Sequence, residues 1–114
     1  MWILPKKHAC DFVKLAPEAV PSFARILKEC LLKLKTLLGD PPYNFILHTA
    51  PYRHKAKEGY WKTIEEDYHW YFQIAPRLSR DAGFEWGTGI HINPTPPEDA
   101  AQLLRETDVT GDLV

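Results

Sequence analysis

The stretch from Tyr68 to Arg77, which reads Tyr-His-Trp-Tyr-Phe-Gln-Ile-Ala-Pro-Arg, constrains the fold more than any other part of the sequence. Side chains alternate between the two faces of a β-strand, so His69, Tyr71 and Gln73 are predicted to share one face. The other face is apolar and carries Trp70, Phe72 and Ile74. The pattern therefore predicts a strand that buries one face against helices, while the opposite face holds groups that can bind metal ions or phosphates. The alternative is a purely structural one: an amphipathic core strand whose histidine is hydrogen-bonded within the protein and has no functional role.

A long amphipathic helix is predicted from about Pro21 to Leu38, because apolar residues recur there at spacings of three and four. A separate short turn is expected at residues 17–20, since Pro21 would clash with a carbonyl four residues earlier in a continuous helix. Gly39 suits the position just after a helix. This helix is predicted to be scaffold.

The remaining segments give weaker patterns. Strands are expected at residues 1–4 and 43–49, with a polar loop at 51–66 in which His54 is a surface residue. Residues 83–93 are expected to form a glycine-containing edge strand with Glu85, Gly87, Gly89 and His91 on one face. A short helix is expected from Thr95, as its N-cap, to about Glu106.

The length and composition of the chain are those of a single globular domain over residues 1–114. Apolar residues make up 45% of the chain and the formal net charge is −1, so nothing indicates a nucleic-acid or membrane surface. Cys10 and Cys30 lack metal-ligand spacing and are predicted to be reduced thiols. The sequence shows neither a membrane-spanning run nor a signal peptide, so cytoplasm is the expected location.

Three blocks carry a family resemblance. They are residues 43–51, residues 69–77 and the run Gly-Phe-Glu-Trp-Gly-Thr-Gly-Ile-His-Ile-Asn-Pro that starts at Gly83. In this order they resemble the C-terminal half of galactose-1-phosphate uridylyltransferases, members of the histidine-triad-like superfamily. The resemblance implies an α+β fold: a mostly antiparallel sheet with one long and one short helix packed on one face. It also implies that the chain is N-terminally truncated relative to that family.

Tyr71 occupies the position where the superfamily normally has its nucleophilic histidine. A tyrosine with a pKa near its reference value of about 10 is protonated at neutral pH and attacks phosphorus poorly. No catalytic residue is therefore assigned, and the isolated chain is expected to be inactive.

A metal site is the first role that the resemblance implies. His48 and His69 match two of the family's zinc or iron ligands, while Tyr71 stands at the third ligand position. Two histidines alone fall short of the four protein ligands of a structural zinc site.

Recognition of a sugar phosphate or nucleotide sugar is the second implied role. The matching positions are Phe84, Glu85 and His91, and Gln73 joins them as a candidate from the central strand. A carboxylate can accept hydrogen bonds from sugar hydroxyls, and an aromatic ring can cover an apolar sugar face.

Two functions stay open from the sequence. The chain is either the hexose-phosphate-contacting C-terminal part of a uridylyltransferase-like nucleotidyltransferase, or a stand-alone, non-catalytic binding or dimerisation module. A homodimer formed through sheet edges or the Tyr60–Trp61 loop, or association with a separate N-terminal half, is expected.

Overall fold

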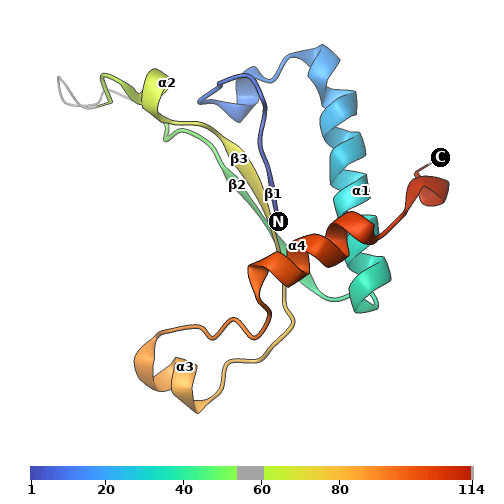
Figure 1. Cartoon of the computed structure of the whole chain (residues 1–114). Coiled ribbons are helices and arrows are strands. Elements are labelled where there is room, and N and C mark those ends of the chain that lie inside the picture. The colour runs from blue at the N-terminus through green and yellow to red at the C-terminus, as the bar shows by residue number, and fades with distance from the viewer. Residues whose placement is uncertain (54–60, 114) are drawn as a thin grey trace. The chain divides into compact units, whose positions relative to one another are not determined.

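The computed structural model describes residues 1–53 and 61–113, so His54 and Tyr60 lie outside the described residues (Figure 1). The chain divides into two compact units. The first unit comprises residues 1–27 and 44–75, and the second comprises residues 28–43 and 76–114.

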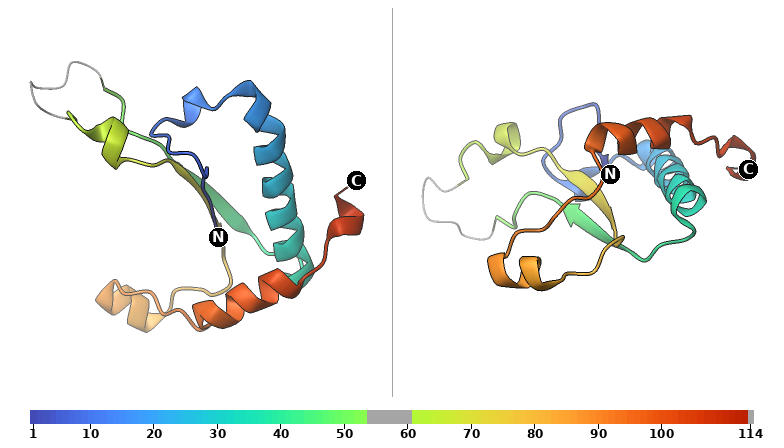
Figure 2. Two further views of the ribbon diagram at one scale, coloured as in Figure 1. Left: turned by 45° about the horizontal axis from the view of Figure 1, so that its top comes forward. Right: turned by 60° about the horizontal axis from the view of Figure 1, so that its bottom comes forward.

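The first unit is built on a three-stranded antiparallel sheet. Its strands are β1 (Trp2–Ile3), β2 (Tyr43–His48) and β3 (Tyr71–Pro76), in the order β1-β3-β2, and Figure 2 shows them side by side. β3, the strand with the predicted alternation, is thus central. Trp2 lies opposite Gln73 in the antiparallel pairing, and the amino terminus donates a hydrogen bond to the Ile74 carbonyl at 2.9 Å.

One face of this sheet packs against the beginning of α1 (Val20–Leu38). The Phe23 ring of that helix makes edge contacts with Trp70 and Phe72, at centroid separations of 6.1 and 5.5 Å. Trp70 is 2% exposed and Ile74 is 1% exposed. The predicted assignment of apolar residues to the buried face of the central strand is therefore confirmed, as is the α+β fold class.

Short helical segments complete the first unit. η1 (Phe12–Lys14) and η2 (Pro17–Ala19) precede α1, as the proline pattern predicted for the second of them. The prediction of an irregular loop over 51–66 is wrong at its end, where α2 (Ile64–Asp67) forms. The reason is burial: Ile64 packs into a small cluster with Cys10 and Ala50.

The second unit contains the end of α1, α3 (Gly83–Thr88), α4 (Pro97–Glu106) and η3 (Thr110–Asp112). The Lys33 ammonium of α1 donates to the Leu104 carbonyl of α4 at 3.0 Å, which ties these two helices together. Leu34 and Val109 are each 4% exposed and form the buried part of this unit. Gly39 has a φ of 69°, the left-handed conformation expected just after a helix.

The predicted edge strand at residues 83–93 is wrong, because α3 occupies its first half. Glu85 accepts a hydrogen bond from the Ala82 backbone N–H at 3.0 Å and thereby caps the start of the helix. Gly89 closes the other end in the left-handed conformation, with a φ of 71°, and its N–H bonds to the Glu85 carbonyl. The glycine interpreted as a strand irregularity is thus a helix terminator.

Thr95 was predicted to be the N-cap of the last helix, and this is also wrong. α4 begins at Pro97, with Pro96 preceding it and no side-chain cap. The Thr95 backbone N–H bonds instead to the Asn93 side-chain oxygen at 3.3 Å. This local turn delays the start of the helix by one residue.

Candidate functional site

Three rings stack across the three strands on the polar face of the sheet. Trp2 of β1 stacks on Tyr71 of β3, with centroids 4.6 Å apart, and Tyr71 stacks on His48 of β2 at 4.2 Å and an interplanar angle of 14°. The Tyr71 ring is therefore covered on both faces. Among the described residues its hydroxyl has no hydrogen-bond partner, and stacking on both faces fixes the ring.

Gln73 lies next to this stack. Its side-chain oxygen is 2.9 Å from His48 Nε2, a hydrogen bond that joins the two outward-facing side chains of β2 and β3. These contacts confirm the predicted placement of Tyr71 and Gln73 on one face of the central strand, and they place His48 of β2 beside both residues.

His69, the third residue of the predicted polar face, precedes β3 by two positions and pairs with His8. The two Nδ1 atoms are 3.2 Å apart, although 61 residues separate the side chains in sequence. His69 Nε2 lies 2.9 Å from the Pro5 carbonyl oxygen, and His8 Nε2 lies 2.8 Å from the Glu65 carbonyl oxygen. His8 is exposed but is also bonded at both ring nitrogens.

The carbonyl contacts fix the protons of this pair. A carbonyl oxygen only accepts, so both Nε2 atoms carry hydrogen. The two Nδ1 atoms then direct lone pairs at each other, and their contact needs a shared proton or a bound cation. Two histidine nitrogens on tetrahedral zinc, with Zn–N distances of about 2.0–2.1 Å, would stand about 3.3 Å apart. The observed separation fits that geometry.

His48 and His69 were expected to approach the same ion. The structure gives them different partners, Gln73 for the first and His8 for the second, and the described part of the chain shows no hydrogen bond between them. Their sharing of an ion stays a prediction.

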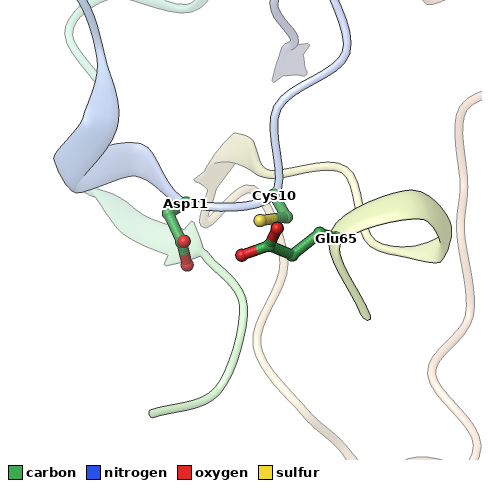
Figure 3. A group of neighbouring side chains, drawn as sticks. All are labelled: Cys10, Asp11 and Glu65. Atoms are coloured by element: carbon green, nitrogen blue, oxygen red, sulfur yellow. The ribbon is translucent and has the colours of Figure 1, made fainter. Parts of the chain in front are cut away.

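A second cluster, shown in Figure 3, joins the segment after β1 to α2. Ligand atoms of Cys10, Asp11 and Glu65 lie within 4.8 Å of one another. Two cations already engage its carboxylates. Arg53 lies 2.6 Å from Asp11 and 3.4 Å from Glu65, and Lys14 lies 3.1 and 3.5 Å from the same two groups. Two positive charges balance two negative ones, so this cluster is an ion-pair network that leaves no excess negative charge for a metal ion.

The Arg53 guanidinium, followed by the Lys14 ammonium, holds the pKa of Asp11 below its ordinary value. A lowered carboxyl pKa stabilises the fold at pH values above the unfolded pKa of about 3.9. That stabilisation is lost as the pH falls through the lower folded pKa.

Replacing Asp11 with asparagine is expected to lower the free energy of unfolding at pH 7 by about 1 kcal/mol, since the pair is partly exposed. The difference from the wild type should begin to shrink below about pH 4, because Asp11 then binds a proton in the unfolded chain before it does so in the folded one. Urea unfolding from pH 7 down to pH 3 measures it, with Asp67→Asn as the exposed control on α2. A difference that stays constant down to pH 3 would contradict the ion-pair assignment.

The sugar-binding candidates Phe84, Glu85 and His91 all belong to the second unit. Phe84 is 52% exposed on α3. The Glu85 pKa is lowered, first of all by the hydrogen bond from the Ala82 backbone N–H. His91 lies 3.3 Å from Asp81 at the surface. The predicted edge-strand arrangement of Glu85 and His91 is replaced by a helix and the loop that follows it.

Comparison with known proteins gives consistent matches over nearly the whole chain. It is 41% identical to the ADP-glucose phosphorylase of Arabidopsis thaliana over 96% of its length, but it spans only 30% of that protein. It is 31% identical to the galactose-1-phosphate uridylyltransferase of Thermotoga maritima over 94% of its length, spanning 34% of that protein. An uncharacterised 16.1 kDa HIT-like protein of Mycoplasma pneumoniae is 24% identical over 93% of the chain. No family model matches the sequence.

Solved structures agree. The crystal structure of Arabidopsis thaliana ADP-glucose phosphorylase with bound ADP-glucose superposes with a TM-score of 0.81, covering 95% of this chain and 33% of the other. The resemblance predicted from the three sequence blocks is confirmed. The chain is similar, over nearly its whole length, to the C-terminal part of uridylyltransferase-like proteins of the histidine-triad-like superfamily. It spans about a third of the length of the first relatives that it matches.

Two features of this chain were missed from sequence. His8 ends the basic turn Pro5–Lys7, where local pattern indicates only exposure, and its partner His69 is 61 residues away. Arg53 is 42 residues from Asp11. In both cases the spacing along the chain carries no signal.

For the described residues, none of the helices is long and apolar enough to cross a membrane.

Proposed function

We propose that this chain is the C-terminal, sugar-phosphate-contacting part of a uridylyltransferase-like nucleotidyltransferase, and that its central strand does not supply the nucleophile. The statement that the central strand supplies no nucleophile rests on Tyr71, whose ring is covered on both faces by Trp2 and His48. A neutral, stacked phenol is a poor nucleophile toward phosphorus. The similarity to ADP-glucose phosphorylase and galactose-1-phosphate uridylyltransferase supports the assignment to the C-terminal part of such a nucleotidyltransferase.

The recognition surface that we assign lies on α3 and the loop after it. Phe84 and Trp86 are 52% and 81% exposed, which leaves aromatic surface to cover the apolar face of a hexose. Glu85 caps the helix through Ala82, and a carboxylate with two oxygens can accept more than one hydrogen bond, including those from sugar hydroxyls. His91 adds a donor that can face a phosphate.

The chain alone is expected to bind galactose 1-phosphate but to catalyse neither its exchange with UDP-glucose nor the phosphorolysis of ADP-glucose. Glu85→Gln should weaken binding about tenfold, because it removes a charged acceptor while its remaining oxygen still caps α3. Titration followed by NMR measures the binding, and product analysis of both mixtures measures turnover.

Glu98→Gln on the first turn of α4 is the matched control, since Glu98 is an exposed glutamate outside the assigned surface. It should bind like the wild type. Product above background from the chain alone would overturn the non-catalytic assignment. Absence of binding, or equal effects of the two substitutions, would overturn the assigned surface.

The alternative function, a non-catalytic interaction module, is favoured by one observation. β2 is an edge of the described sheet, and Phe45, Ile46 and Leu47 are 46%, 41% and 40% exposed along it. An apolar edge strand is a ready surface for pairing with another chain. The same titration separates the two functions, because a pairing module has no reason to bind galactose 1-phosphate.

A divalent metal such as zinc belongs to the proposal as a structural group. We assign its two ligands from this chain to His8 Nδ1 and His69 Nδ1, in place of the pair His48 and His69. Metal-bound histidines commonly donate their second N–H to a backbone carbonyl, and the Pro5 and Glu65 carbonyls stand in that position here. Bound there, the ion would fasten the segment after β1 to the segment that leads into β3.

A further inference from the structure

We propose that a cavity of about 580 Å³ in the first unit binds a small amphipathic anion, with a flat apolar body and one carboxylate. The cavity lies between the segment that follows β1 and the beginning of α1, and Trp70 contributes to its wall. All of its lining residues belong to the first unit. The proposal is independent of the transferase function, since no residue assigned to sugar recognition lines this cavity.

The size and the walls of the cavity determine the body of the ligand. Pockets of about 300–1,000 Å³ accommodate typical small ligands. The walls are mainly aliphatic and aromatic, and they include Ile3, Phe23, Ile26 and Trp70. Among the lining residues, only Ser22 has a hydroxyl group. A nucleotide sugar would leave its hydroxyls without partners on such walls. An aromatic or aliphatic body has no hydroxyls that would need hydrogen-bond partners on these walls.

Trp70 supplies an unused hydrogen-bond donor. The residue is 2% exposed, and its indole Nε1 has no hydrogen-bond partner among the described residues. Because the Trp70 side chain forms part of the cavity wall, an aromatic ligand bound there would change the chemical shift of its indole N–H, which therefore reports occupancy.

The charges around the cavity select an anion. Its charged lining residues are the lysines Lys6, Lys7 and Lys14, and none of the lining residues is acidic. Lys14 is already paired with Asp11 and Glu65. Lys6 and Lys7 have no acidic partner in the described part of the chain, so they can meet the carboxylate of a ligand whose body lies against Trp70.

The test uses 2-naphthoate as the anionic probe and 2-naphthalenemethanol as its neutral counterpart. Each is titrated into the ¹⁵N-labelled chain, and the indole N–H signal of Trp70 is followed after assignment with Trp70→Phe. We expect 2-naphthoate to shift this signal saturably and to bind at least fivefold more tightly than the neutral probe. The indole signal of Trp86, which does not line the cavity, should stay in place.

Two sets of variants locate the site. Lys6→Gln with Lys7→Gln should weaken 2-naphthoate binding about fivefold, because two exposed charges are removed. Lys28→Gln with Lys62→Gln is the matched control and should bind normally. Ser22→Trp should fill the cavity and abolish binding. Absence of a saturable Trp70 shift, equal binding of both probes, or equal effects of the two lysine pairs would overturn the proposal, even if Ser22→Trp fails to fold.

Discussion

Trp70→Ala is expected to lower the free energy of unfolding by about 3–5 kcal/mol, the range typical of deleting a large buried aromatic side chain. Trp70 is 2% exposed, and its ring makes edge contacts with Phe12 at 5.0 Å and Phe23 at 6.1 Å. Alanine would leave a void between β3, η1 and α1, and the rings around it cannot close that void without losing their own contacts. Small domains are stable by only about 5–15 kcal/mol, so a third or more of the stability is at stake.

Urea unfolding followed by far-UV circular dichroism measures this change without depending on tryptophan fluorescence. Trp86→Ala is the matched control, because it deletes the same side chain at a position that is 81% exposed. The control should change the free energy of unfolding by no more than about 0.5 kcal/mol. Similar costs for the two substitutions would show that Trp70 is not the centre of the first unit's core.

Zinc binding is expected to depend on His8 and His69 and to be independent of His48. His8→Ala and His69→Ala should each weaken zinc binding by about tenfold or more, since each removes one of the two assigned nitrogens. The two Nδ1 atoms lie 3.2 Å apart. Hydrogen bonds from the Nε2 atoms to backbone carbonyl oxygens orient both rings. Isothermal titration calorimetry of the purified chain with zinc chloride gives the affinities.

His48→Ala and His91→Ala are the controls. His48 is held by Gln73 and Tyr71, and His91 lies at the surface next to Asp81, so neither should alter the affinity. If His48→Ala weakens binding as strongly as His69→Ala while His8→Ala has no effect, the pair His48 and His69 holds the ion and the assignment to His8 is wrong. Zinc binding that is undetectable in the wild type would contradict both pairs.

Local pattern predicted the frame of the protein well. The alternation along residues 68–77 assigned Trp70 and Ile74 to the buried face, because a strand permits only two directions for its side chains. The apolar spacing of the long helix predicted a start at about Pro21, and α1 begins at Val20. Pattern failed at residues 83–93. The alternation there was weak, and a glycine can end a helix as readily as it can interrupt a strand.

The sequence by itself determined which residues face the two sides of the central strand, where the long helix lies and which superfamily the chain resembles. These are properties of neighbouring residues, or of blocks in a fixed order. Only the tertiary structure decided that His69 pairs with His8, that Asp11 pairs with Arg53 and that Tyr71 is stacked between Trp2 and His48. Each of these contacts joins residues at least 23 positions apart in the sequence, as between His48 and Tyr71. Such contacts depend on strand order and register, which no local spacing encodes.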